Sequence, residues 1–205
     1  MKRRDIIIAA RILSALFTPF YLPILGFIAL FMFSYMSLLP VKYKLFVLMV
    51  VYFFTILLPT LLIHLYRRYQ GWSLIELGIK ERRMIPYIIS ILCYFFCFYL
   101  MSLLHIAQFM RMIVVIALTI QVMCAFINIW WKISTHTAGI GGIAGTLVVY
   151  SIGFGYDPTW WFCLLLIIGG LVGTARMILR QHSLGQVVGG FAVGLITSSV
   201  TIGVF

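Results

Sequence analysis

The sequence predicts an all-α integral membrane protein with six to seven transmembrane helices. Hydrophobic residues make up 64% of the 205-residue chain, charged residues make up 9%, and the mean hydropathy is +1.15. Soluble domains are about half apolar and about a quarter charged. A transmembrane helix needs about 20 mostly apolar residues, so this length holds at most six or seven of them. The composition therefore excludes a soluble enzyme, a disordered segment and a disulfide-stapled secreted module.

The apolar stretches divide residues 1–205, taken as one transmembrane domain, into seven candidate spans. Pro19 and Pro23 interrupt the first stretch, so we expect an interfacial helix before Pro19 and then a span. Short polar turns and Gly-containing junctions separate the later stretches, and the longest polar stretch, 67–85, predicts an interfacial loop. The candidate spans are 12–39, 45–66, 86–104, 112–131, 136–154, 159–179 and 184–204.

The positive charges predict an orientation. With seven spans, twelve Lys and Arg residues lie on one side of the membrane and three lie on the other. Basic residues gather in cytoplasmic loops, so we expect the N-terminus on the cytoplasmic side. The same bias accounts for the formal charge of +11 without nucleic-acid binding. The twelve are Lys2, Arg3, Arg4, Arg11, Arg67, Arg68, Lys80, Arg82, Arg83, Lys132, Arg176 and Arg180, and the three are Lys42, Lys44 and Arg111.

Two polar clusters lie where spans begin or end. Lys132, Ser134 and His136 come before or at the start of the fifth span, and Arg176, Arg180, His182 and Gln186 surround the junction of the sixth and seventh. Ionisable groups in or beside spans are costly and are therefore functional candidates. Lys and Arg bind phosphate oxygens, and two histidines can divide the work of nucleophile and general acid. We expect phosphoryl chemistry on a lipid phosphate.

A metal site is not expected beside these clusters. No Asp or Glu lies near them, and Cys93, Cys97, Cys124 and Cys163 lie in apolar runs without a metal-ligand pattern. The alternative for each cluster residue alone is a structural role: the basic residues as cytoplasmic anchors, and the histidines bonded to nearby backbone.

The spacing of these residues resembles the type 2 phosphatidic acid phosphatase (PAP2) superfamily. Arg176-x5-His182-x3-Gln186, followed by Val-Val-Gly-Gly, is similar to the family's third signature, Arg-x5-His-x3-Asp. Ile133-Ser134-Thr135-His136 resembles the second, Pro-Ser-Gly-His. The first, Lys-x6-Arg-Pro, has its nearest counterpart in 80–86, which keeps basic residues and the Pro but not the spacing. The resemblance is good over 130–194 and thin before it.

The resemblance implies an all-α fold with a PAP2-like helical core, and it implies a role for each motif residue. His182 would attack phosphorus and form a phosphohistidine, and His136 would protonate the leaving oxygen. Arg176 would hold phosphate oxygens with help from Ser134. Lys80, Arg82 or Arg83 would add charge if that loop folds over the site, and Lys132, which has no assigned place in the family pattern, would be a further phosphate contact. No cofactor is implied.

The departures keep a second function open. Gln186 stands where the family has Asp, and an amide orients a histidine but offers no charge to stabilise imidazolium. The expected function is a metal-independent lipid phosphate phosphatase. The alternatives are a non-catalytic lipid-phosphate binder and, less favoured, an anionic-lipid transporter, because the charges gather at one face.

The expected location is a membrane, with the bacterial inner membrane as the expectation and the site on its cytoplasmic side. The expected partners are the bilayer and a phosphatidate, a glycerophosphate lipid or an isoprenyl phosphate. The sequence does not select among these lipids and gives no oligomeric state.

Glycines on the last three spans predict close helix packing. Gly141 and Gly145 form a Gly-x3-Gly pair on the fifth span. Such pairs let helix backbones approach each other in membranes. We expect these glycines to meet the small residues of the sixth and seventh spans and so to hold the two motifs together. Those residues are Gly169, Gly170, Gly173, Gly189, Gly190 and Gly194.

Overall fold

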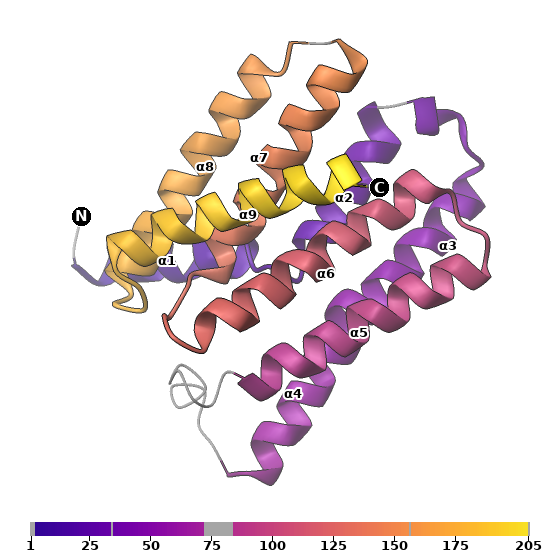
Figure 1. The fold of residues 1–205 in the computed structure, drawn as a ribbon. Helices are drawn as coiled ribbons and strands as arrows, with labels where there is room; N and C mark the ends of the chain where they lie inside the picture. Colours follow the sequence, from indigo (N-terminus) through magenta and orange to yellow (C-terminus); the bar gives the residue numbers. More distant parts are fainter. Residues whose placement is uncertain (1–2, 34, 72–83, 156, 205) are drawn as a thin grey trace. The chain divides into compact units, whose positions relative to one another are not determined.

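The protein is all-α in a computed structural model (Figure 1). The structure describes residues 3–33, 35–71, 84–155 and 157–204, and these contain no β-strand. The chain divides into two compact units. Unit 1 is Met1–Pro19 with Thr119–Phe205, and unit 2 is Phe20–Leu118. The helices are α1 (Arg3–Leu16), α2 (Leu22–Phe33), the 3-10 turn η1 (Tyr35–Leu38), α3 (Val41–Tyr52), the π-helical turn η2 (Phe53–Leu57), α4 (Leu58–Tyr69), α5 (Met84–Leu103), α6 (Gln108–Asn128), α7 (Thr135–Phe154), α8 (Thr159–Ile178) and α9 (Leu184–Val204).

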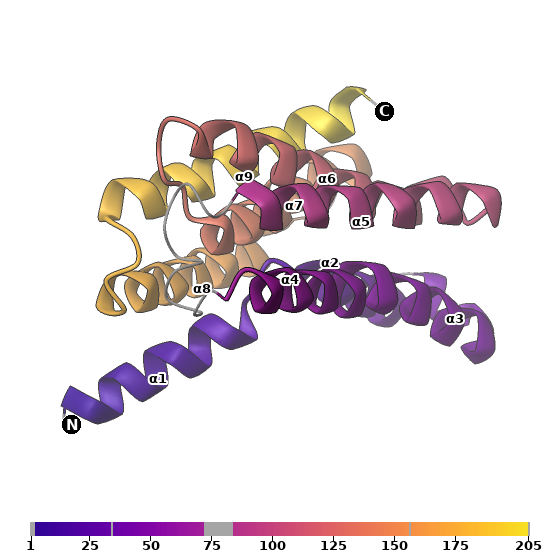
Figure 2. The ribbon, with the colours of Figure 1, turned by 90° about the horizontal axis from the view of Figure 1, so that it is seen from below.

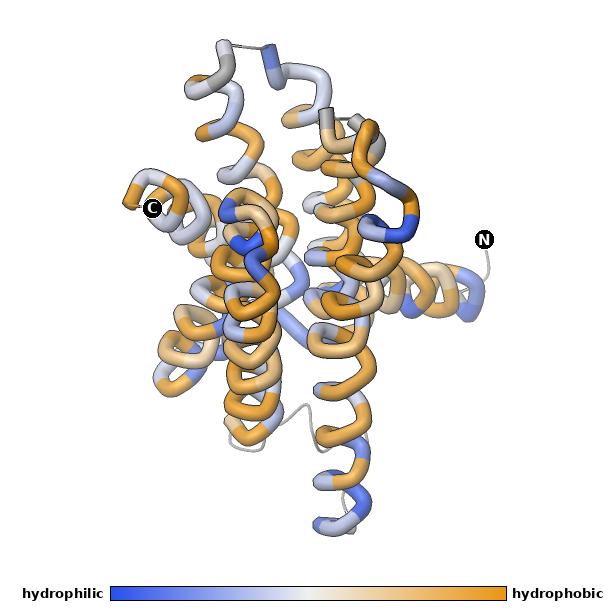
Figure 3. The backbone as a smooth tube through the Cα atoms, turned by 90° about the vertical axis from the view of Figure 1, so that its right-hand side faces the viewer, coloured by the Kyte–Doolittle hydropathy of each residue, from blue (hydrophilic) through white to orange (hydrophobic). Residues whose placement is uncertain are grey.

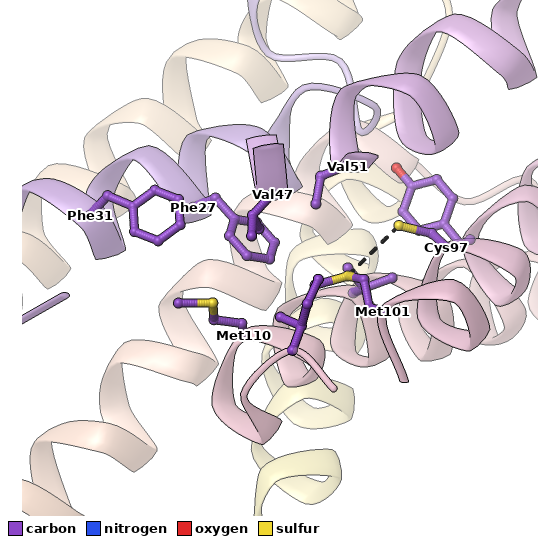
Figure 4. Close-up of a cluster of buried hydrophobic side chains, with 10 residues drawn as sticks. Phe27, Phe31, Val47, Val51, Cys97, Met101 and Met110 are labelled. Atoms are coloured by element: carbon purple, nitrogen blue, oxygen red, sulfur yellow. Dashed lines mark hydrogen bonds between the residues drawn. The ribbon is translucent and has the colours of Figure 1, made fainter. Parts of the chain in front are cut away.

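Unit 2 is held by a core of large side chains. Phe27, Tyr94 and Met101 are fully buried in it, each with 0% exposure. Figure 4 shows Met101 from α5 beside Met110 from α6, with Cys97 bonded to the Met101 sulfur. Aromatic rings and flexible thioethers fill irregular spaces between helices. The core therefore depends on side-chain volume. Its buried members are Phe27, Phe31, Val47, Val51, Tyr94, Cys97, Met101, Ile106, Met110 and Val114.

A π-helical turn interrupts the long helix that runs from α3 through α4. η2 precedes Pro59, which has no N–H to donate to the carbonyl four residues earlier. Two nearby hydroxyls bond other backbone carbonyls: Thr55 Oγ1 donates to Val51 O at 2.8 Å, and Thr60 Oγ1 donates to Leu57 O at 3.0 Å. The helix thus continues past the proline through a π-helical turn, with a hydroxyl bonded to the backbone on each side of it.

Unit 1 contains α7, α8 and α9 with α1 and the second half of α6. The principal contact is between α7 and α9, and α8 packs against α7 and α1. Figures 1 and 2 show α7 beside α9 and α1 beside the end of α8. Residues from the two ends of the chain therefore lie together in this unit.

The first predicted span, 12–39, differs in the structure. It contains the end of α1, a turn at Pro19, the whole of α2 and η1. α2 has 12 residues and so extends about 18 Å, short of the ~30 Å hydrocarbon core. Pro19 breaks the helix as expected, but the segment after it does not continue as one helix to Leu39. The predicted interfacial loop 67–85 begins inside α4, and its residues 72–83 lie outside the described part.

The length and apolar composition of its helices identify the protein as an integral membrane protein. Five helical segments in the described residues are long and apolar enough to cross a bilayer, namely Val41–Tyr69, Met84–Leu103, Gln108–Asn128, Thr159–Ile178 and Leu184–Val204. On α8, Trp160, Leu164, Ile167 and Leu171 form an exposed apolar stripe at helical spacing. Figure 3 shows the hydrophobic residues running along the helices. Such exposed apolar faces are what lipid contact requires.

The turn before α8 contains Asp157, whose carboxylate bonds the first residue of the helix. Its Oδ1 accepts hydrogen bonds from Thr159 Oγ1 at 2.5 Å and from the Thr159 backbone N–H at 2.9 Å. These two bonds, the hydroxyl bond first, hold the pKa of Asp157 below its ordinary value. The carboxylate thus helps to begin α8.

Candidate active site

The imidazole of His182 is oriented by the amide of Gln186. His182 lies between α8 and α9, is 7% exposed, and has its Nδ1 3.2 Å from Gln186 Oε1. The backbone N–H of Ser183 donates to the same atom at 3.2 Å, which identifies it as the acceptor oxygen. An amide oxygen only accepts, so His182 Nδ1 carries the proton of this bond. In the neutral ring Nε2 then keeps its lone pair.

A tight turn at the end of α8 brings the chain back toward His182. The Arg180 N–H donates to Met177 O at 2.9 Å, and the Gln181 N–H donates to Arg176 O at 3.0 Å. This pair of bonds is the Schellman pattern that ends many helices. Arg180 occupies its left-handed position with φ of 54°. The turn fixes the path from Arg176 on α8 to His182 in the loop.

The guanidinium of Arg176 is held by a serine from the other end of the chain. Arg176 is 8% exposed, and its Nη1 donates to Ser14 Oγ at 2.8 Å. Ser14 lies on α1, is 6% exposed, and is 162 positions away in the sequence. A hydrogen bond to a charged group fixes its geometry more strongly than a neutral one. Nothing in the local sequence around Ser14 indicates this contact.

The start of α7 is hydrogen-bonded to the start of α9. The Ser134 N–H donates to Gln186 O at 3.3 Å, and Thr137 Oγ1 donates to Val187 O at 2.9 Å. Thr137 Oγ1 also lies 3.1 Å from Ser134 O. These bonds join the two motifs through their backbones. Thr137 was not among the predicted site residues, although it lies one position after His136.

Ser134 is fully buried in front of the first turn of α7. Its exposure is 0%, and its backbone is extended, with φ −89° and ψ 103°. Its hydroxyl has no hydrogen-bond partner among the described residues. A buried hydroxyl in this state is able to donate to a ligand oxygen.

Glycines allow α7 and α9 to meet backbone to backbone. A Cβ on Gly194 would lie 1.8 Å from Ala138 O, and one on Gly190 would lie 2.5 Å from Ser134 O. A Cβ on Gly141 would lie 2.0 Å from Phe191 O. The predicted glycine packing is present between these helices. Gly170 takes no part in it, since nothing lies within 4 Å of its added Cβ.

The remaining predicted residues lie in three situations. His136 is half-buried in the first turn of α7, and Lys132 is half-buried in the loop before it. Gln186 is half-buried in the first turn of α9. Lys80, Arg82 and Arg83 lie outside the described residues. In the described part of the chain no three side chains of His, Cys, Asp or Glu gather as metal ligands would.

Residues 126–205 match the family model described as PAP2 superfamily. This part of the chain is similar to the PAP2 superfamily. The matching PAP2 region contains α7, α8 and α9 and both motifs, so the family resemblance of the sequence is confirmed there. No curated protein and no solved structure shows significant similarity to the chain.

The PAP2 superfamily is a phosphatase-type family, and the matching region departs from its third signature at Gln186. The amide nevertheless contacts His182 at the position from which the family's Asp would orient the ring. What differs is charge, because a neutral amide does not offset an imidazolium as a carboxylate does. The PAP2 region thus keeps the orienting contact without the charge.

Proposed function

We propose that the protein is a metal-independent lipid phosphate phosphatase that acts through a phosphohistidine. The observation that carries the proposal is the bond from His182 Nδ1 to Gln186 Oε1, which leaves Nε2 as the nucleophilic atom. Arg176 is buried in the last turn of α8, just before the loop that contains His182, and its guanidinium supports a phosphate subsite there. The PAP2 match supports phosphatase-type chemistry.

In the first step His182 Nε2 attacks the phosphorus of a lipid phosphate. A N–P bond forms while the P–O bond to the lipid alcohol breaks, and the bonding electrons leave with that oxygen. His136, protonated, donates its proton to the leaving oxygen and becomes neutral. The products of this step are the free lipid alcohol and phosphohistidine.

In the second step water attacks the phosphohistidine. Neutral His136 accepts a proton from the water as its oxygen bonds to phosphorus, and the N–P bond breaks. Inorganic phosphate leaves, His182 recovers its lone pair, and His136 is protonated again. Protons and electron pairs balance over the two steps.

The charge that develops on the phosphate oxygens is met by fixed donors. Arg176 supplies a guanidinium whose position Ser14 fixes, and Ser134 supplies its buried hydroxyl. Lys132 adds positive charge from the loop before α7. Lys80, Arg82 or Arg83 has a similar role in this mechanism. Donors that are already oriented stabilise the transition state without reorganising.

The proposed substrate is a lipid phosphate at the cytoplasmic face of a bacterial inner membrane. The twelve-to-three distribution of Lys and Arg supports this side. The exposed apolar faces of α8 and α9 support a substrate with hydrocarbon chains. A phosphatidate, a glycerophosphate lipid and an isoprenyl phosphate all fit this chemistry.

The test is phosphate release by the purified protein in detergent with EDTA, from a panel of these lipids. His182→Ala should abolish release, because the nucleophile is lost, and His64→Ala is the matched control outside the motifs. We expect release to survive EDTA and the control. Normal turnover by His182→Ala would refute the phosphohistidine mechanism.

The alternative function is a lipid-phosphate binder without hydrolysis, and the neutral Gln186 is the observation that favours it. Gln186→Asp separates the two. A phosphatase should keep or gain activity, since a carboxylate stabilises the imidazolium that forms. A binder should show no release in either form, yet should retain a phosphorylated lipid through purification.

A further inference from the structure

A groove lies between α1 and the C-terminal end of α8, outside the buried Arg176–His182 cluster. Its volume is about 290 Å³, and it combines two basic side chains with four aliphatic ones. Arg11 and Arg180 are exposed, so their guanidinium groups are accessible. None of the lining residues is acidic. The lining consists of Ile6, Ile7, Arg11, Ile178, Leu179 and Arg180.

Arg180 occupies a backbone conformation that favours glycine. Its φ is 54°, at the left-handed position of the turn that ends α8. Glycine takes this position without strain, whereas a side chain carries a cost. Residues held in such conformations gather at functional sites, where the surrounding structure maintains them. An arginine at position 180 therefore makes this turn less stable than a glycine would.

The α1 wall of the groove is anchored to the rest of unit 1. Ala10 and Ser14 are buried, with 5% and 6% exposure, and Ser14 bonds Arg176. Ile7, Ala10, Arg11 and Ser14 share one side of α1 by their helical spacing. Because these buried residues fix α1 to unit 1, Arg11 is held in the same groove lining as Arg180.

We propose that this groove binds the phosphodiester headgroup of an anionic phospholipid from the surrounding leaflet. Arg11 and Arg180 bind the phosphate oxygens, and the aliphatic side chains contact the glycerol and upper acyl segments. The mixture of guanidinium and aliphatic lining fits an amphiphile better than a free anion. A phosphodiester lipid bound here is a ligand and not a substrate, so the proposal does not depend on hydrolysis.

The test measures binding with the full-length protein in a neutral detergent. Short-chain phosphatidylglycerol is titrated while thermal unfolding is followed, because a ligand of the folded state raises the midpoint, and at a given concentration a tighter ligand raises it more. Phosphatidylcholine of the same chain length and inorganic phosphate are titrated in parallel. The variants are Arg11→Gln, Arg180→Gly and Arg180→Lys. Arg4→Gln is the matched control, an exposed arginine of α1 that does not line the groove.

The expected result separates binding from stability. Arg180→Gly should unfold at the same or a higher temperature without lipid, since glycine suits the turn, yet bind phosphatidylglycerol about fivefold more weakly. Arg11→Gln should weaken binding similarly, while Arg180→Lys and Arg4→Gln should bind nearly as the unaltered protein does.

Three results would overturn the proposal. Undiminished binding by Arg180→Gly would remove the groove as the site. An equal loss in Arg4→Gln would assign binding to diffuse charge on α1. An equal shift with inorganic phosphate or phosphatidylcholine would show that the ligand is not an anionic lipid.

Discussion

The helices within unit 1 and the helices within unit 2 pack through different kinds of contact. In unit 1, α7 and α9 touch backbone to backbone through Gly141, Gly190 and Gly194, and hydroxyls bond across the contact. In unit 2, large side chains such as Phe27 and Met101 fill the space between helices. The candidate site is therefore positioned by backbone contacts, which tolerate little change, whereas the core of unit 2 depends on side-chain volume, which tolerates conservative exchange.

The largest effect should come from a methyl group at the α7–α9 contact. Gly194→Ala places a Cβ where Ala138 O lies 1.8 Å away, so the helices must separate. We expect a loss of about 3 kcal/mol in unfolding free energy or a failure to fold. Gly170→Ala is the control, with nothing within 4 Å of the added atom. Equal stability of the two variants in thermal unfolding would contradict the backbone account.

The next effect concerns the serine that holds Arg176. Ser14→Ala removes a hydrogen bond to a charged, buried group, which is worth roughly 1.5–3 kcal/mol. We expect KM for a lipid phosphate to rise by about tenfold, the equivalent of 1.4 kcal/mol, with a smaller change in kcat. Ser14→Thr keeps the hydroxyl and should recover much of the affinity. A purely structural role would lower stability and leave KM unchanged.

A smaller effect should follow from Thr137→Val, which is close in shape but lacks the hydroxyl. The variant loses the bonds from Thr137 Oγ1 to Val187 O and Ser134 O. Side-chain hydrogen bonds between membrane helices average about 0.6 kcal/mol and reach about 1.7. We expect a drop in unfolding free energy within this interval, measured by denaturant titration. Thr146→Val, whose hydroxyl bonds only its own helix at Gly142 O, should change stability less.

The smallest effect should come from Met101→Leu in unit 2. The side chain is fully buried, but the exchange nearly conserves volume. We expect a cost below about 1.5 kcal/mol and unchanged phosphate release. A loss as large as that of Gly194→Ala would remove the contrast between the two units.

The sequence predicts the site through spacing and the helices through hydropathy. The motif spacing and the apolar runs predict Arg176, His182 and Gln186 at the junction of two spans, and in the structure they lie at the junction of α8 and α9. The glycine faces predict the α7–α9 contact because small residues at helical spacing let two membrane helices approach each other closely. Both inferences rest on local patterns.

What the sequence does not predict depends on contacts between distant residues or on unusual backbone. The bond from Arg176 to Ser14 joins residues 162 positions apart, and no local pattern marks Ser14. The left-handed backbone of Arg180 was not expected either, because such a position normally indicates glycine. The break of 12–39 into α1, α2 and η1 was only partly expected from Pro19. Span boundaries and the roles of the site residues stay predictions.

If His182 is the nucleophile, it carries the phosphoryl group between the two steps, and the group can be detected there by chemical trapping. The protein is mixed with a lipid phosphate labelled in its phosphoryl group, quenched rapidly, and digested for mass spectrometry. His136→Ala should help the intermediate to accumulate when the leaving group is good, because water activation is slowed. We expect an acid-labile, base-stable label on the peptide that contains His182, and no such label in His182→Ala. Phosphate release without any label on His182, or a label that persists in His182→Ala, would contradict it.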